Sequence, residues 1–409
     1  MTSVVHPGDL LTRRQRALYV VVLGALTALG PFTIDLYLPA FPQIESDLGV
    51  STAVIQLTLT ATTIGFALGQ LLVGPWSDAV GRRLPLILAT SLHVGASIGV
   101  ALAPDITWLM VFRVLQGFGA AAGGVVAMAT VRDLFGGYPL VRMLSRLALV
   151  NGLAPILAPV IGSQLLLVMP WRGLFVALAA YGVIIVIAAA LLIVETLPPE
   201  RRVAPGHASI GERYRSLFRD RVFIGVAIIG GMSFSGLFAY LSASPFLFQE
   251  VYGLDPQGYG LLFAMNSIGV VAGVQISSRL ARRIPPAWIL SVSTFVLLMS
   301  ATAIIVLDLA GVGFWGTVVP LWFFITACGF GFPMVQALAL ANHGAEAGTA
   351  ASLLGAMNFG LAGLLSPIVG LFGIANAVPM GVVMAATSVV SIVSLWVIVR
   401  PSTVPPLSR

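Results

Sequence analysis

The sequence predicts an all-α membrane protein with twelve transmembrane helices arranged in two related six-helix halves. The first observation is composition, because 58% of the 409 residues are hydrophobic and only 9% are charged, against about 25% charged in a soluble domain. The second is that uncharged stretches of about 20 residues, the length that crosses a bilayer core, recur along the chain. The third is a polar segment at 196–220, which has six such stretches on either side.

The composition also excludes several classes of protein. So few charges cannot cover the surface of soluble domains, and a disordered chain needs the opposite balance. A single cysteine, Cys328, excludes an internal disulfide and cysteine-based metal sites. There is no lysine, so the chain has no P-loop. The net charge of +6 comes without a basic patch interleaved with aromatics. We therefore predict no nucleic-acid partner, no metal and no cofactor, and the absence of any hydrolase or metalloprotease motif gives no support to a membrane enzyme.

The spans are read as the stretches between charged residues. Arg16 to Glu45 encloses the first, interrupted by Asp35, and we expect it to stay as a helix because it is too long for a cleaved signal peptide. The next nine lie within Asp47–Asp78, Arg83–Asp105, Asp105–Arg132, Arg146–Arg172, Arg172–Glu195, Arg221–Glu250, Asp255–Arg279, Arg283–Asp308 and 308–346. The stretch 346–400 holds two more, with a turn near 373–379.

The predicted domain organisation follows from these spans. An N-terminal half at 1–195, a cytoplasmic linker at 196–220, a C-terminal half at 221–400 and a cytoplasmic tail at 401–409 account for the whole chain. All 21 basic residues are arginine, and with both termini inside only Arg172 falls outside and Arg113 within a span. The excess of arginine in the inner loops therefore predicts cytoplasmic termini.

A short repeat relates the two halves. Gly81-Arg82-Arg83-Leu84-Pro85 follows the second span, and Ala281-Arg282-Arg283-Ile284-Pro285 follows the eighth, 200 residues later. Chance similarity among apolar helices is the alternative. A parallel repeat of this kind would place a substrate site at the interface of the halves, near the membrane midplane.

Three segments resemble motifs of the major facilitator superfamily. Residues 74–85, with Gly74, Asp78, Gly81, Arg82 and Arg83, are similar to the family's cytoplasmic loop between helices two and three. Residues 109–117 resemble its membrane-arginine motif. Residues 151–163 resemble its antiporter motif, although Ala154, Ala158 and Ser163 stand where glycine is usual.

Further segments are similar to the bicyclomycin and chloramphenicol resistance group within that family, namely 34–42, 66–70, 195–202 and 348–353. The resemblance implies a monomeric, proton-driven antiporter that exports lipophilic drugs by alternating access. Its partners would be a small drug, protons and the lipid bilayer, in the cytoplasmic membrane of a bacterium. The alternatives are a metabolite exporter or symporter, for example of a nucleoside or sugar, and a passive facilitator.

Asp35 and Arg113 are the charges predicted inside spans. A charge there costs about 2.5–3.5 kcal/mol on insertion scales, so each needs a reason. At the helical rise Asp35 lies about 15 Å from Glu45 and Arg113 about 12 Å from Asp105, so both are expected at similar depth. Asp35 is the predicted proton carrier and Arg113 its partner. The alternatives are a static ion pair, or Arg113 as a scaffold bonded to carbonyls of the first helix.

The predicted substrate surface is apolar and aromatic with a few amides, which suits a lipophilic, weakly polar drug. Ile34, Asp35 and Leu38 share a face of the first span. Later spans contribute Asn151, Phe234, Phe238, Leu241, Asn266 and Asn358. Ordinary helix packing is the alternative for each of them.

The predicted gate consists of the 74–85 loop and the fifth span. Asp78 is expected to interact with a helix N-terminus near Gly348, and Arg82 and Arg83 with acids across the halves. The alternative is that both arginines serve only as topology anchors. Pro155 and Pro159 should bend the fifth span, and Gly162 should allow close approach of another helix. This would seal the cavity against proton leak, and a packing kink is the alternative. His93 is predicted to be a packing residue rather than a proton relay.

Overall fold

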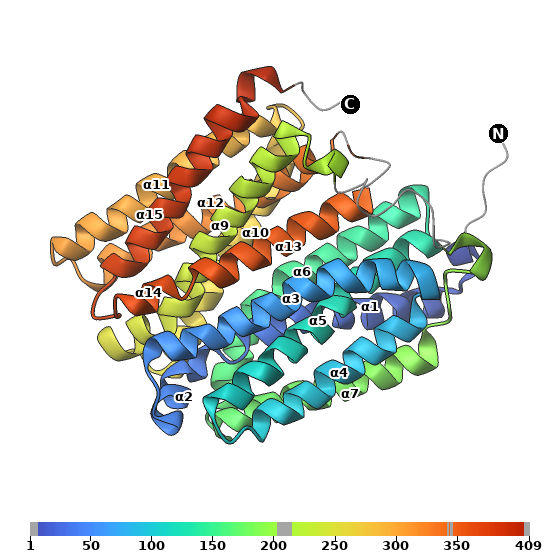
Figure 1. The fold of residues 1–409 in the computed structure, drawn as a ribbon, viewed down its shortest axis with the longest axis horizontal. Helices are drawn as coiled ribbons and strands as arrows, with labels where there is room; N and C mark the ends of the chain where they lie inside the picture. The colour runs from blue at the N-terminus through green and yellow to red at the C-terminus, as the bar shows by residue number, and fades with distance from the viewer. Residues whose placement is uncertain (1–6, 203–214, 342, 344–346, 405–409) are drawn as a thin grey trace. The chain divides into compact units, whose positions relative to one another are not determined.

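The computed structural model describes residues 7–202, 215–341, 343 and 347–404. Over these residues the regular structure is helical and contains no strand (Figure 1). Twelve helical segments of the described chain are long and apolar enough to cross a membrane, which confirms the predicted number of spans. Residues 203–214 of the predicted linker and 405–409 of the predicted tail lie outside the described residues.

The helices form two compact units, and each is described here by itself. Unit 1 consists of Met1–Tyr37 and Ile64–His207, and unit 2 of Leu38–Thr63 and Ala208–Arg409. Residues 38–63 belong by sequence to the first six spans, yet they pack within unit 2. The chain therefore passes from one unit to the other directly after Tyr37 and returns within the next long helix.

Unit 1 is built around contacts between small residues. Its helices are α1 (Arg13–Asp35), the second part of α3 (Thr52–Val80), α4 (Arg83–Ala101), α5 (Ile106–Leu134), α6 (Gly137–Leu165) and α7 (Trp171–Leu192). The α4 helix packs against α5 and α7, and α1 packs against α5 and α6. A Cβ on Gly119 of α5 would lie 2.5 Å from the Ala89 carbonyl oxygen of α4. Glycine there lets the two backbones meet closely, as is usual between membrane helices.

Unit 2 contains the remaining helices. These are η2 (Leu38–Ala40), α2 (Phe41–Leu48), the start of α3, α9 (Arg221–Phe246), η4 (Leu247–Val251), α10 (Pro256–Leu280), α11 (Pro286–Leu309), α12 (Phe314–Leu340), α13 (Ala347–Leu365), α14 (Ile368–Leu371), α15 (Val378–Val393), η6 (Ser394–Val399) and η7 (Pro401–Thr403). The α9 helix packs against α13 and α15, while α12 packs against α10 and α11. The predicted turn near 373–379 corresponds to the connection between α14 and α15.

The first span differs from the prediction of one uninterrupted helix. The α1 helix ends at Asp35, a short 3₁₀ segment follows, and α2 begins at Phe41. Pro39 and Pro42 lie in this stretch, and proline removes a backbone donor that a continuous helix would need. The depth of Asp35 calculated from an unbroken helical rise was wrong in that respect, because the rise changes at the break.

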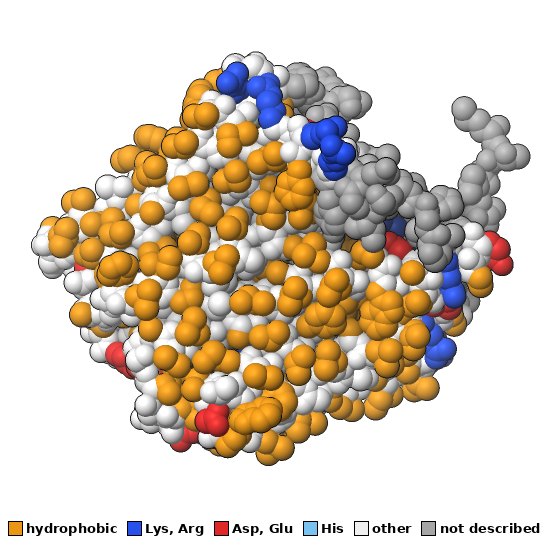
Figure 2. Space-filling model, viewed as in Figure 1, with side chains coloured by type: hydrophobic (Ala, Val, Ile, Leu, Met, Phe, Trp, Pro, Cys, Tyr) orange, Lys and Arg blue, Asp and Glu red, His pale blue; other side chains and the backbone are white. Residues whose placement is uncertain are grey.

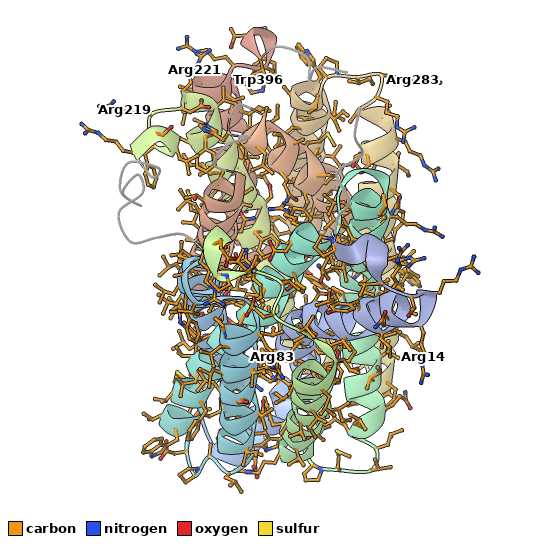
Figure 3. All side chains as sticks on the ribbon, turned by 90° about the vertical axis from the view of Figure 1, so that its right-hand side faces the viewer. Arg14, Arg83, Arg219, Arg221, Arg283 and Trp396 are labelled. Atoms are coloured by element: carbon orange, nitrogen blue, oxygen red, sulfur yellow. The ribbon has the colours of Figure 1, made fainter. Side chains whose placement is uncertain are left out.

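Exposed apolar side chains cover the helices, as expected for surfaces that face lipid (Figure 2). Charged side chains gather near helix ends instead. In unit 2, Arg219, Arg221 and Arg283 lie toward one end together with Trp396 (Figure 3). This distribution fits helices that carry arginine at the cytoplasmic boundary of a membrane.

Candidate functional site

Asp35 is the last residue of α1 and is buried, with 5% of its surface exposed. Among the described residues, none places a hydrogen-bond donor or a cation on its carboxylate. A buried charge without a partner is costly, and taking up a proton removes that cost. The role of Asp35 as proton carrier stays a prediction at this point.

Arg113 of α5 lies fully buried in the same unit but is not bonded to Asp35. Its Nη1 donates to the backbone carbonyl of Thr33 at 3.0 Å and to Oε1 of Gln116 at 2.6 Å. Its guanidinium lies 4.0 Å from the centre of the Tyr37 ring, within range of a cation–π contact. This is the arrangement of the scaffold alternative, in which Arg113 holds a carbonyl of the first helix.

Two donor atoms of Arg113, Nε and Nη2, are buried without a partner in the described part of the chain. Leaving a buried donor unpaired costs about 1–3 kcal/mol, and more on a charged group. The guanidinium therefore keeps donors available within two residues of Asp35, since it already contacts Thr33 and Tyr37 on either side of that acid.

A buried polar network supports Arg113 from α4 and α5. Nε2 of Gln116 donates to Oγ of Ser97 at 2.7 Å, and Ser97 Oγ donates to the backbone carbonyl of His93 at 2.8 Å. Nδ1 of His93 lies 3.2 Å from the carbonyl oxygen of Gln116, which closes the network on itself. Satisfied networks of this kind fix side-chain positions in an apolar interior. His93 thus joins α4 to α5, in agreement with its predicted packing role.

Gly162 of α6 lies against the break in the first span. A Cβ at this position would overlap the carbonyl oxygen of Leu36, the residue after Asp35. Pro155 and Pro159 lie inside α6, as the sequence predicts. The backbone carbonyl of the residue after Asp35 is therefore in close contact with a glycine of the predicted antiporter motif.

The predicted gate loop is held inside unit 1. Arg82 forms ion pairs with Asp78 and, at 2.8 Å, with Asp133, and Arg83 donates to the carbonyl of Ala190. Both arginines therefore have partners within their own unit, and their predicted contacts across the halves stay a prediction. Burial lowers the pKa of Arg82, but the hydrogen bonds to Asp133 and Asp78 outweigh it and the pKa lies above its usual range. The predicted contact of Asp78 near Gly348 stays a prediction.

Glu195, directly before the linker, closes this loop. Its carboxylate accepts backbone N–H bonds from Arg82 at 2.9 Å and from Arg83 at 3.2 Å. Gly81 has φ of +107°, and a Cβ there would overlap the same carboxylate, so glycine is required twice over. Burial raises the pKa of Glu195, but these N–H groups, that of Leu197 and the Arg202 charge outweigh it and leave the pKa below its usual range. Gly74 has no such need, since a Cβ there would meet only Val125 at 3.6 Å.

In unit 2 the structure brings two predicted substrate residues together. Phe234 and Phe238 stack with ring centres 5.3 Å apart, and Phe359 of α13 meets Phe234 edge-on at 5.1 Å. Phe332 of α12 adds a fourth ring at 5.5 Å from Phe234. Three of the four rings are partly exposed, so the phenylalanine cluster of residues 234, 238, 332 and 359 presents an aromatic surface from three helices.

Two predicted amides each carry a buried oxygen without a partner in the described structure. Oδ1 of Asn358 faces Gly230 of α9, and Oδ1 of Asn266 is also unpaired although its Nδ2 donates to the Tyr240 hydroxyl at 3.1 Å. Leu241 of α9 is buried. Of the remaining predicted substrate residues, Ile34 is buried in unit 1, Leu38 is buried in unit 2, and Asn151 is exposed on α6.

Gln56 of α3 forms a clamp inside unit 2 that was not predicted. Its Nε2 donates to the carbonyl of Ser242 in α9 at 3.1 Å, and its Oε1 accepts the N–H of Gly370 in α14 at 2.9 Å. Thr60, one turn on, donates to the carbonyl of Gly363 at 2.8 Å. These bonds fasten residues 38–63 to helices of the second six spans.

The residues that sequence reasoning missed are Gln56, Ser97, Gln116, Phe332 and Phe359. A usable signal existed for two pairs, because Gln116 follows Arg113 by three residues and Ser97 follows His93 by four, so each pair shares a helix face. The phenylalanines and Gln56 carry no such local signal, since their partners come from distant helices.

Comparisons with known proteins agree with this architecture. The family model described as Major Facilitator Superfamily matches residues 21–367. An uncharacterized MFS-type transporter, YdgK of Bacillus subtilis, is 36% identical over 93% of this chain and 94% of its own. A bicyclomycin resistance protein homolog of Haemophilus influenzae is 30% identical over 93% of this chain and 95% of its own. The multidrug resistance protein MdtL of Vibrio parahaemolyticus is 30% identical over 92% and 94%.

Solved structures share the fold at low sequence identity. A D-xylose-proton symporter gives a TM-score of 0.76 at 14% identity and covers 95% of this chain and 98% of its own. A bacterial homolog of the human lysosomal transporter Spinster gives a TM-score of 0.73 at 16% identity, with 96% and 98% covered. These likenesses concern the fold alone.

Proposed function

Because the chain belongs to the major facilitator superfamily, we propose that it is a proton-driven antiporter that exports small lipophilic drugs from bacteria, chloramphenicol- or bicyclomycin-like in character. The observation that carries the proposal is Asp35, a buried carboxylate without a partner among the described residues, at the end of α1. Relatives named for bicyclomycin and multidrug resistance support the substrate class.

In the proposed mechanism Asp35 holds either a proton or a charge that must be compensated. The compensating donors in this proposal are Nε and Nη2 of Arg113, which have no partner among the described residues. Arg113 already contacts Thr33 and Tyr37, which lie two residues before and after that acid. Deprotonation would draw the guanidinium toward the carboxylate, and protonation would return it to Gln116. Substrate binding that favours one of these states excludes the other, which is the thermodynamic basis of exchange.

Alternating access in this proposal requires the Gln56 clamp to open. Residues 38–63 are joined by sequence to the first spans, whereas Gln56 and Thr60 are bonded to α9, α13 and α14. Movement of the two six-helix halves as bodies would break these bonds on one side of the membrane. The loop in which Arg82 pairs with Asp78 and donates its backbone N–H to Glu195 would then rearrange on the other side of the membrane.

The test uses proteoliposomes with an imposed pH gradient and a panel of chloramphenicol, bicyclomycin, a nucleoside and a sugar. The native chain is expected to move one of the drugs against its gradient with counterflow of protons. Asp35→Asn should abolish the pH-driven component while substrate exchange without a gradient continues, and Asp308→Asn, which changes an acid at a helix end, should retain it. Retention of pH-driven transport by Asp35→Asn would refute the proton-carrier role, and transport of the nucleoside or sugar alone would refute the drug assignment.

A further inference from the structure

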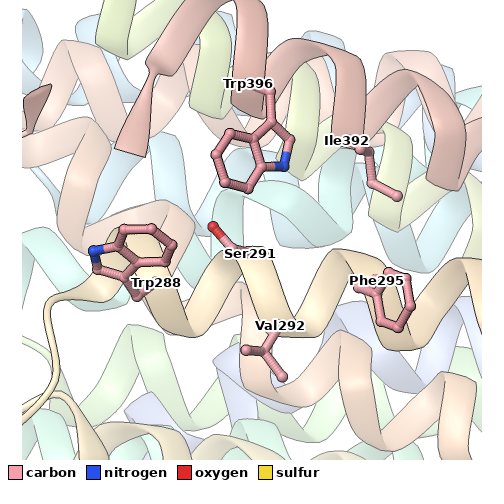
Figure 4. A pocket seen from close by; sticks show the side chains of 6 residues that line it. All are labelled: Trp288, Ser291, Val292, Phe295, Ile392 and Trp396. Atoms are coloured by element: carbon pink, nitrogen blue, oxygen red, sulfur yellow. The ribbon is translucent and has the colours of Figure 1, made fainter. Parts of the chain in front are cut away.

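A surface groove of about 300 Å³ lies between α11 and the C-terminal helix. One stripe of α11 forms its floor, because residues at positions 288, 291, 292 and 295 recur on one helix face. Ile392 of α15 and Trp396 of η6 form the other wall (Figure 4). The groove lies wholly within unit 2 and has no part in the site described above.

The lining of the groove favours a hydrocarbon occupant. Ser291 is its one polar side chain apart from the two indoles, and its hydroxyl already donates to the carbonyl of Ala287 at 2.9 Å. Val292 is 65% exposed and Phe295 58% exposed, and both belong to a membrane span. A satisfied, apolar groove inside the hydrocarbon layer is filled most favourably by an acyl chain, since a polar ligand would find no partner there.

A tryptophan pair marks one end of the groove. Trp288 lies in the first turn of α11, and Trp396 lies in η6, three residues before that helix ends at Val399. Their rings meet edge-on with centres 6.2 Å apart. Phe295 and Ile392 lie toward the other end (Figure 4). Exposed tryptophans favour the boundary between hydrocarbon and headgroups. The groove therefore runs from the headgroup level into the bilayer.

Two arginines lie close in sequence to the tryptophan pair. Arg283 precedes Trp288 by five residues, Arg400 follows Trp396 by four, and both arginines are exposed. Segments 279–288 and 392–404 contain no acidic residue. Arg400 adopts a left-handed conformation with φ of 58°, which ends the helix there at the membrane boundary. Basic side chains at this level attract anionic lipid, each contributing measurably to binding.

We propose that this groove binds one acyl chain of an anionic phospholipid of the cytoplasmic leaflet, with Arg283 and Arg400 holding its phosphate headgroup. The two indole N–H groups at the headgroup level supply further donors to the same lipid. The site is independent of the proposed transport reaction. It differs from ordinary lipid contact because it combines a hollow for the chain with charge of one sign at one end.

The test is native mass spectrometry of the delipidated full-length protein, titrated with phosphatidylglycerol or with phosphatidylcholine that carries the same acyl chains. The native chain is expected to retain one phosphatidylglycerol in preference. Arg283→Gln with Arg400→Gln should weaken that binding about tenfold or more, from the loss of two basic side chains. Ser291→Phe, which fills the groove without changing charge, should also remove the bound lipid. Arg13→Gln with Arg14→Gln, an equal loss of exposed charge in unit 1, is the matched control and should bind as the native chain does.

Quenching of tryptophan fluorescence is a second measurement, and it can be made on the native chain. Tryptophan fluorescence of the native chain should be quenched more by phosphatidylglycerol brominated in its acyl chains than by the brominated phosphatidylcholine, and Trp288→Phe with Trp396→Phe should remove the difference. Equal binding and equal quenching by the two lipids would overturn the proposal. Equal losses in the Arg283/Arg400 and Arg13/Arg14 variants would also overturn it, because they would indicate diffuse charge attraction without a site.

Discussion

Replacing Gln116 by leucine tests whether the buried network controls Arg113. The substitution removes the 2.6 Å bond to Nη1 of Arg113 and the 2.7 Å bond to Ser97 while nearly preserving volume. A hydrogen bond to a charged group contributes about 1.5–3 kcal/mol, which corresponds to roughly tenfold to a hundredfold in the equilibrium between two positions of the guanidinium. Arg113 would keep the Thr33 carbonyl and the Tyr37 ring, and the Gln116 bond would no longer oppose a turn toward Asp35.

The expected result is a slower pH-driven export whose half-maximal pH moves toward acid, because a carboxylate paired with arginine holds its proton less firmly. The assay is drug transport in proteoliposomes at a series of imposed pH values, with the amount of folded protein measured in each sample. Gln164→Leu, at an exposed glutamine of α6, is the matched control and should leave the profile unchanged. An unchanged profile in Gln116→Leu, with normal amounts of protein, would show that the network does not set the state of Asp35.

Three further predictions follow from single contacts. Gly162→Ala should slow transport and lower the free energy of unfolding by about 1–3 kcal/mol, because the added carbon overlaps the Leu36 carbonyl. Gly124→Ala, which has open space, should change neither. Equal thermal midpoints for the two variants would contradict the contact. Phe359→Ala should raise KM for an aromatic drug several-fold, as a lost aromatic pair costs about 0.5–1.5 kcal/mol, while lipid-exposed Phe372→Ala should leave KM as it is. Glu195→Gln should lower the free energy of unfolding near pH 7 by an amount on the order of 1 kcal/mol. Since the folded-state pKa of Glu195 is depressed, that stabilisation is complete above the ordinary pKa and disappears as pH falls through the lowered one, so a difference that grows toward acid would contradict it.

The number of spans could be predicted from the sequence because it depends on a local quantity, the length of uncharged runs. The family resemblance was confirmed for the same reason, since its motifs are contiguous. The break after Asp35 was missed because the prolines at 39 and 42 were read as part of a span, and the hydropathy of the stretch does not change there. A proline beyond the first turn is the local signal that could have revealed it.

The site was predictable only in part. Charges inside spans are rare enough to single out Asp35 and Arg113. Their relation was not predictable, because depth along two helices does not determine which way a long side chain turns, and Arg113 turns to Gln116. Phe332 and Phe359 could not be found at all, since only the packing of α9, α12 and α13 brings the four rings together.

The position of Asp35 gives the proposed mechanism a mechanical basis as well as a chemical one. Unit 1 includes the chain up to Tyr37, and unit 2 begins at Leu38, three residues after the acid. On that three-residue stretch lie the Leu36 carbonyl packed against Gly162 and the Tyr37 ring stacked on Arg113. We expect a change of charge at Asp35 that moves Arg113 to move Tyr37 as well, because the guanidinium lies on that ring. If proton binding acts through this joint, Gly162→Ala and Gln116→Leu should be non-additive in transport rate, because both act on the same three residues; fully additive losses would separate the chemistry of the acid from the movement of the chain.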